Sequence, residues 1–198
     1  MRRPFFGHLR KSMSSPEAPT ATSRAQARSA RWWAIGLAKA SVALAIVYLP
    51  LAWFADHYRI VYDSVKGANC LPYSVFLVDL RDRATDRGEY VAFVTRQMEP
   101  FYANGTIAVK QIAAVPGDRV EVGTQGVAIN GRPQGALLHL NEGERLWRMG
   151  RRIWDVERDE LVPRGHLWMM GTKPRSYDSR YWGYIENEQI IGRAIPLW

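Results

Sequence analysis

The stretch GANCLPYSVFLVDL, residues 67–80, contains the one cysteine of the 198-residue chain, Cys70. Pro72 follows it, and residues 74–80 form a short apolar run rich in branched and aromatic side chains, which is typical of a strand. A single cysteine excludes an intrachain disulfide and a cysteine-based zinc site. Cys70 is therefore either a small buried hydrophobe, the usual role of a free cysteine, or a nucleophile.

Short strand-like segments separated by Gly and Pro turns make up most of the chain beyond residue 55. They lie at residues 57–65, 74–80, 89–95, 105–115, 116–122, 126–133, 166–171 and 189–198. Residues 135–162 mix helical and strand signals, and we treat them as an insertion. Without a long amphipathic helix in this region, the pattern predicts a mostly β domain over residues 55–198.

Residues 32–54, WWAIGLAKASVALAIVYLPLAWF, carry one charge, Lys39. At about 1.5 Å per residue, a helix of this length crosses a hydrocarbon core of roughly 30 Å. Tryptophans at both ends of the run fit the aromatic belts of membrane interfaces. We predict an uncleaved transmembrane anchor; the alternatives are a cleaved signal peptide and a buried core helix.

Residues 1–31 hold seven Lys and Arg residues against one Glu, which is most of the net charge of +8. This basic excess belongs to a tail, so it does not indicate a nucleic-acid partner. The tail has no apolar pattern, and we expect it to be disordered. The positive-inside rule places it in the cytoplasm and residues 55–198 outside, which predicts a single-pass protein of a bacterial inner membrane with a periplasmic domain.

Lys110 lies within the apolar segment TIAVKQIAAV, residues 106–115. Strand alternation allows it to face solvent, which is the usual place of a lysine. A desolvated lysine, partly neutral near pH 7, is instead a general base. Asp178 and Arg180, in the loop TKPRSYDSRYWG at residues 172–183, are either a structural ion pair or part of a site.

Taken in this order behind one anchor, these segments resemble the signal peptidase I family of membrane-anchored Ser/Lys endopeptidases. The family's lysine, five residues and Pro-Gly-Asp match Lys110 to Asp118, and its Ser-x-Asp-Ser-Arg-Tyr-Trp-Gly matches residues 176–183. The resemblance implies a signal-peptidase-like β domain. It implies that Lys110 is the general base, that Ser176 holds its amine, and that Asp178 and Arg180 brace the site.

The nucleophile region is similar to the TraF branch of conjugative-transfer peptidases, whose pattern is Ser-x-Pro-x-Gly-x-Tyr. Residues 70–76, CLPYSVF, lie over that pattern, so the resemblance places Cys70 at the nucleophile position. Ordinary signal peptidases place the proline one residue later. A thiol ionises more easily than a hydroxyl, and a nearby ammonium favours the thiolate. Ser74, where the pattern has glycine, is the rival nucleophile.

Ala68 stands where the family often has a hydroxyl that contributes to the oxyanion hole. We expect the backbone N–H of Cys70 to be one oxyanion donor. Asn69 and Ser64 are candidates for a second donor. No cofactor and no metal site are predicted.

The resemblance predicts an endopeptidase that uses a Cys70/Lys110 dyad on a membrane-inserted precursor, with a pilin subunit as the expected substrate. The expected enzyme matures this precursor for conjugative transfer, either by hydrolysis or by joining the two ends of the precursor. Its partners are that precursor and the lipid bilayer, which Trp147, Trp154 and Trp168 contact unless they are core residues. The alternatives are a general signal peptidase I for secretory preproteins and an inactive membrane-anchored assembly protein with the same fold.

Overall fold

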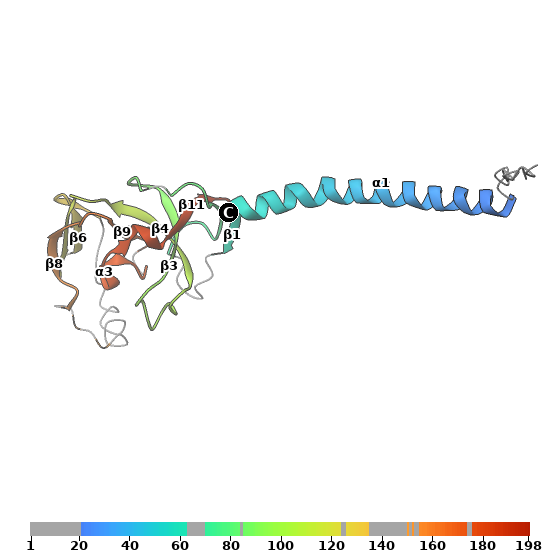
Figure 1. The fold of residues 1–198 in the computed structure, drawn as a ribbon. Helices are drawn as coiled ribbons and strands as arrows, with labels where there is room; N and C mark the ends of the chain where they lie inside the picture. The colour runs from blue at the N-terminus through green and yellow to red at the C-terminus, as the bar shows by residue number, and fades with distance from the viewer. Residues whose placement is uncertain are drawn as a thin grey trace, which may run out of the picture. The chain divides into compact units, whose positions relative to one another are not determined.

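The computed structural model describes residues 21–62, 70–83, 85–123, 126–134, 150, 152, 155–173 and 176–198. The chain divides into two compact units, Met1–Leu51 and Ala52–Trp198. The second unit contains two antiparallel sheets, shown in Figure 1, and so confirms the prediction of a mostly β domain.

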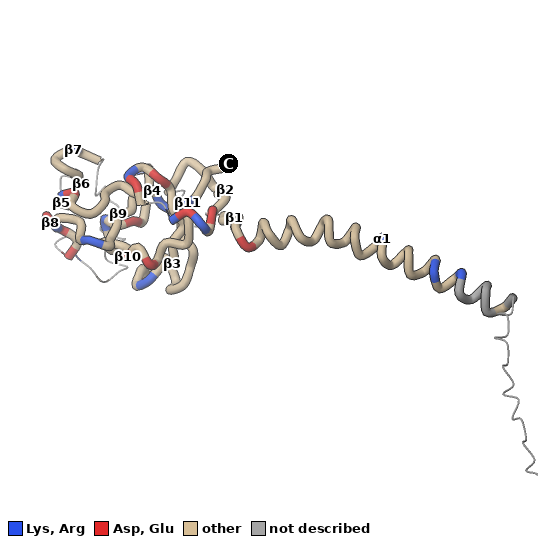
Figure 2. The backbone as a smooth tube through the Cα atoms, turned by 45° about the horizontal axis from the view of Figure 1, so that its top comes forward, with Lys and Arg blue, Asp and Glu red and all other residues tan. Residues whose placement is uncertain are grey.

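Helix α1 (Ala21–His57) is the one helix in the described part of the chain that is long and apolar enough to cross a membrane, over Arg28–His57. Figure 2 shows that most of α1 carries neither acidic nor basic positions. The expectation of a disordered tail is wrong for residues 21–31, which are helical. Ala and Arg dominate this stretch, and both are strong helix formers that extend a helix already nucleated by the apolar run. Residues 1–20 lie outside the described residues.

The larger sheet has seven strands among the described residues. Their order is β1 (Tyr58–Tyr62), β2 (Val75–Asp79), β11 (Ile190–Pro196), β3 (Tyr90–Val94), β4 (Ile107–Ala114), β9 (His166–Met170) and β10 (Ile185–Glu186). The smaller sheet has the order β7 (Arg132–Pro133), β6 (Gly126–Ile129), β5 (Arg119–Gly123) and β8 (Arg158–Leu161). Because β11 pairs with both β2 and β3, the end of the chain closes the middle of the larger sheet.

Each strand-like segment of the sequence contains a strand of the structure. The turn between β6 and β7 is Asn130-Gly131, with φ angles of 52° and 72°, the left-handed pair that a two-residue hairpin requires. Four short elements were not predicted: β8, helix α3 (Ser179–Trp182), β10 and the 3₁₀ helix η2 (Asn187–Gln189). Strand β8 falls within the predicted insertion, most of which lies outside the described residues.

Strand β4 is covered on both faces. Ala108 and Ile112 pack into a cluster with Tyr102 and Tyr177, whereas Val109 packs into a second cluster with Leu71. Side chains alternate between the two faces of a strand, so Lys110 lies on the face of Ala108 and Ile112. This placement sets the position of the predicted base.

Asp118 joins the two sheets at the Pro-Gly-Asp turn. Its carboxylate accepts hydrogen bonds from the N–H of Val115 and from Asn130, both at 2.8 Å, and from Arg87 at 2.5 Å. Burial raises the pKa of Asp118, but the hydrogen bonds from Val115, Asn130 and Arg87 outweigh it and hold this pKa below its ordinary value. The Pro-Gly-Asp motif therefore has a structural role in this chain, because Asp118 holds the end of β4, the β6–β7 turn and Arg87 together.

We expect Asp118→Asn to destabilise the full chain in detergent by roughly 1.5 kcal/mol at pH 7, the low end for hydrogen bonds to a charged group, because Arg87 is half-exposed. The pKa of Asp118 is lower in the folded state than in the unfolded state, where it is about 3.9. The carboxylate therefore contributes its full stabilisation above about pH 3.9, and this contribution is lost as the pH falls through the folded-state pKa. Urea unfolding at pH 7 and pH 3 checks this: the difference from wild type should shrink at pH 3. Asp159→Asn is the control, because Asp159 forms an exposed ion pair with Arg119. Its free energy of unfolding should differ little from that of wild type.

Candidate active site

Lys110 is fully buried in the middle of the larger sheet. Its Nζ donates to the hydroxyl of Tyr102 at 3.3 Å and lies 5.8 Å from the centre of the same ring. The alternative of a solvent-facing lysine is therefore wrong, because both faces of β4 are covered. Removal from water disfavours the charged form of an amine, so this environment suits a lysine that works as a base.

Gly171 directly follows β9, the strand next to the one that carries Lys110. Gln111 pairs with Met170 across β4 and β9, and continuing this register by one residue sets Gly171 opposite Lys110. A Cβ at Gly171 would lie 2.1 Å from the Oγ of Ser176 and 2.7 Å from the carbonyl oxygen of Cys70. The missing side chain of Gly171 thus leaves the space next to Lys110 for Ser176 and for the backbone of Cys70.

Ser176 presents a buried hydroxyl in this space, and its Oγ has no hydrogen-bond partner among the residues that the structure describes. A buried hydroxyl without a partner costs free energy, and such groups are rare in native structures. The hydroxyl lies against Gly171, the residue that the register sets opposite Lys110, which is a suitable place from which to orient an amine. The position agrees with the role that the resemblance implies for Ser176, which stays a prediction.

Asp178 and Arg180 form a buried two-point ion pair, with Nε–Oδ1 at 2.6 Å and Nη2–Oδ2 at 2.7 Å. The pair also holds the loop around the site. Asp178 accepts from the N–H of Gly171 at 3.0 Å and caps the start of α3, while Arg180 donates to the carbonyl of Ser176 at 3.1 Å. Of the two interpretations of this pair, bracing the site fits these contacts better than an isolated loop pair.

Cys70 is also buried. Its carbonyl accepts from the N–H of Thr172 at 2.9 Å and of Lys173 at 3.4 Å, so the cysteine backbone rests on the loop that carries Ser176. Ser74 begins the approach to β2, and its N–H donates to the carbonyl of Trp198. Ser64, Ala68 and Asn69 lie outside the described residues, which leaves the second oxyanion donor a prediction.

Sequence reasoning assigned no role in this site to two of the residues that build it, Gly171 and Tyr102. Gly171 closes the Met-Met-Gly segment, and a glycine at the end of an apolar strand is the signal of a close backbone approach. Tyr102 lies between two predicted strands and carries no local pattern that points to Lys110. Trp168 is fully buried, so it is a core residue, whereas Trp147 and Trp154 lie outside the described residues.

Gly171→Ala should strongly impair this site. The new methyl group overlaps Ser176 and the Cys70 backbone, and overpacking of this kind costs about 1–3 kcal/mol. Because a displacement of about 1 Å reduces catalysis about 100-fold, we expect a loss of that size in cleavage rate. Gly123→Ala, where nothing lies within 4 Å of the new Cβ, is the matched control. Equal rates for the two variants would contradict the close approach at Gly171.

The backbone of Cys70 and the hydroxyl of Ser176 thus meet at Gly171, which the strand register sets opposite the buried Lys110 at one end of the β4–β9 pair. The family model described as signal peptidase, peptidase S26, matches residues 33–198, and the chain belongs to this family.

Three curated relatives show how the similarity is distributed. Signal peptidase I of Leptolyngbya laminosa is 29% identical over 114 residues, 55% of this chain and 50% of that protein. The conjugal transfer protein TraF of Agrobacterium fabrum is 33% identical over 91 residues, 46% of this chain and 48% of that protein. Signal peptidase IB of Staphylococcus aureus (strain COL) is 24% identical over 183 residues, 84% of this chain and 88% of that protein.

The first two of these alignments span about half the length of the relative. A solved structure, a signal peptidase I from Enterococcus faecalis V583, is 23% identical and covers 57% of this chain and 97% of that chain, with a TM-score of 0.35.

Proposed function

We propose that this chain is a membrane-anchored endopeptidase that cuts its substrate through Cys70 and Lys110. The observation that carries this proposal is the full burial of Lys110 on the strand face where Ser176 fills the space above Gly171. A buried amine can exist in its neutral form and accept the proton of a neighbouring thiol. The Cys70 backbone borders the same space, which favours Cys70 as the group that Lys110 serves.

In the proposed reaction, the Sγ of Cys70 attacks the scissile carbonyl carbon while its proton passes to Lys110. The carbon–nitrogen bond breaks, the leaving amine takes that proton, and a thioester remains on Cys70. Water then adds to the thioester and the carbon–sulfur bond breaks, which yields the carboxylate product and the free thiol. A peptide amine in place of water forms a new peptide bond, so the same thioester serves hydrolysis and cyclisation.

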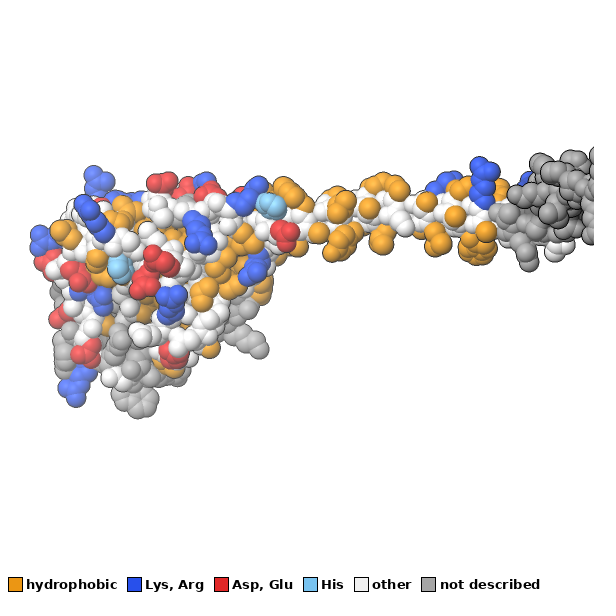
Figure 3. All heavy atoms as spheres, viewed as in Figure 1, with side chains coloured by type: hydrophobic (Ala, Val, Ile, Leu, Met, Phe, Trp, Pro, Cys, Tyr) orange, Lys and Arg blue, Asp and Glu red, His pale blue; other side chains and the backbone are white. Residues whose placement is uncertain are grey.

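We place this site at the outer surface of a bacterial inner membrane, with the basic tail in the cytoplasm and the sheets in the periplasm. Exposed apolar side chains on β1 and β11 support a position of this unit next to lipid. Ile60, Leu77 and Ile195 are aligned across β1, β2 and β11, with Ile60 64% exposed and Ile195 42% exposed. Figure 3 shows hydrophobic side chains gathered over the region of β1 and along the visible face of α1.

As substrate we propose a pilin precursor of a conjugal transfer system. Support comes from the position of Pro72, two residues after Cys70, and from the similarity to a conjugal transfer protein. A general signal peptidase I is the second candidate, favoured by the alignment with signal peptidase IB over 84% of this chain.

Deletion of the chain from its host separates these candidates. Loss of conjugation with normal preprotein processing supports the pilin role, whereas accumulation of many preproteins supports the general peptidase. Full complementation by Cys70→Ala, by Ser74→Ala and by Lys110→Met would instead indicate an assembly protein without peptidase activity.

A further inference from the structure

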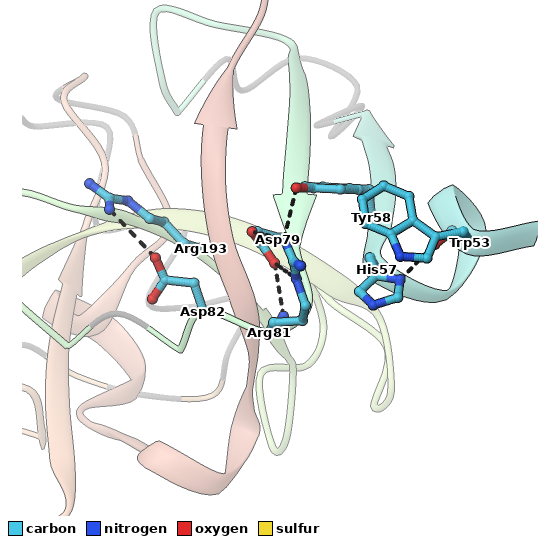
Figure 4. A network of polar contacts seen from close by, with 7 residues as sticks. All are labelled: Trp53, His57, Tyr58, Asp79, Arg81, Asp82 and Arg193. Atoms are coloured by element: carbon cyan, nitrogen blue, oxygen red, sulfur yellow. Dashed lines mark hydrogen bonds and ion pairs between the residues drawn. The ribbon is translucent and has the colours of Figure 1, made fainter. Parts of the chain in front are cut away.

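The last turn of α1 is attached to the catalytic unit at the far end of strand β2. Ala52–His57 belongs to the same compact unit as the sheets, and the N–H of Leu80 donates to the carbonyl of His57 at 2.9 Å. Figure 4 shows side chains from the end of α1, from β1 and from the end of β2 that lie close together. We call this group the collar; it consists of Trp53, His57, Tyr58, Asp79 and Arg81.

Arg81 is the centre of the collar. Its Nη2 donates to the hydroxyl of Tyr58 at 2.8 Å, and its Nε and Nη2 each lie 3.2 Å from a carboxylate oxygen of Asp79. The guanidinium carbon lies 5.9 Å from the ring centre of Trp53 and 5.3 Å from that of Tyr58, within the range of cation–π contacts. One side chain thus joins the last turn of α1, the start of β1 and the end of β2.

Further contacts stiffen the helix side of the collar. The rings of Trp53 and His57 stack with centres 4.6 Å apart, and Nδ1 of His57 lies 2.6 Å from the carbonyl oxygen of Trp53. Phe54 stacks on Tyr58 with ring centres 5.2 Å apart. On the strand side, the side-chain hydrogen bond from Arg81 is the main cause that holds the pKa of Asp79 below its ordinary value.

Strand β2 connects the collar to the nucleophile. It runs from Val75, five residues after Cys70, to Asp79 in the collar. The C-terminal end of the apolar helix is therefore held at one end of the strand whose other end follows the nucleophile. If Ala52–His57 were released and extended, this segment would reach about 20 Å instead of the roughly 9 Å it spans as a helix.

We propose that the collar, centred on Arg81, determines which peptide bond of a membrane-inserted precursor is cut. The inference rests on the proposed function. Enzyme and precursor are both anchored in the same bilayer. The distance that the chain can span between the anchor and Cys70 therefore decides which residues of the precursor reach the thiol. An extended substrate advances about 3.3 Å per residue, so a few ångströms of added slack brings a neighbouring bond into reach. Arg81 acts here as a positioning residue and takes no part in the chemistry.

The test uses the full chain in phospholipid vesicles with a model precursor. This probe has one apolar span followed by two identical small-residue cleavage motifs, placed three residues apart, about 10 Å of extended chain. Intact mass spectrometry measures the share of each product. Wild type should cut predominantly at one motif, and Arg81→Ala should raise the share of the other at least fivefold. The total rate on a short soluble peptide should stay within about twofold of wild type.

Arg96→Ala is the matched control, because Arg96 is also an exposed arginine in an ion pair, with Glu186 at 2.9 Å, and lies outside the collar. Tyr58→Phe removes only the hydroxyl that Arg81 contacts and should shift the product ratio in the same direction, which keeps the test valid if Arg81→Ala folds poorly. An unchanged product ratio in both collar variants overturns the inference. If wild type cuts neither motif nor the soluble peptide, the proposed function itself fails.

Discussion

Cys70→Ala should abolish precursor cleavage, with a loss on the order of 10⁴-fold or more, the scale seen when a peptidase loses its nucleophile. The substitution removes the only thiol of the chain and leaves just the binding and oxyanion contributions. A methyl group fits where the buried thiol was, so the fold should persist. Initial rates on a purified precursor, with circular dichroism as the folding check, measure the effect.

Two further variants make the Cys70 result specific. Cys70→Ser keeps a nucleophile, but a hydroxyl ionises less easily than a thiol. Its cleavage rate should therefore lie between those of wild type and Cys70→Ala. Ser74→Ala should keep wild-type activity, because the described contact of Ser74 with Trp198 is made by its backbone N–H. Wild-type cleavage by Cys70→Ala together with loss in Ser74→Ala would move the nucleophile to Ser74.

Lys110→Met should lower kcat/KM by about 10²- to 10⁴-fold, the usual contribution of a positioned general base. Methionine has a similar length and suits the apolar surroundings, so stability should not fall, since burial of a lysine amine is itself costly. Lys110→Arg keeps a cation that does not release its proton and should be equally inactive. Rates of cleavage and urea unfolding on the same preparations separate catalysis from folding. Activity of Lys110→Met within tenfold of wild type would contradict the role of a base.

The strands and the anchor could be predicted because their apolar patterns are local. The face on which Lys110 lies could not, since alternation assigns a residue to one face or the other but does not say that both faces of β4 are covered. Helix α3 escaped prediction because its four residues carry no helical period; the side chain of Asp178 and the packing of Ser179 against β9 define it.

The site was predictable in its residue types but not in its construction. Cys70, Lys110 and Ser176 came from motif resemblance, whereas their convergence depends on Gly171, which matters through the side chain it lacks. The collar was invisible in the sequence for a related reason. Arg81 contacts Trp53 and Tyr58, which lie more than twenty residues earlier in the chain and on other elements, so no local pattern around Arg81 indicates these contacts.

The most direct test of the central claim is to trap the acyl-enzyme. Wild-type protein is mixed with precursor, quenched in acid within seconds and measured by intact mass spectrometry before and after neutral hydroxylamine, which cleaves thioesters. The account predicts an adduct with the mass of the acyl fragment, mapped to the peptide containing Cys70, lost with hydroxylamine and absent from Cys70→Ala. An adduct that maps to Ser74, or product formation by Cys70→Ala at the wild-type rate, would contradict it.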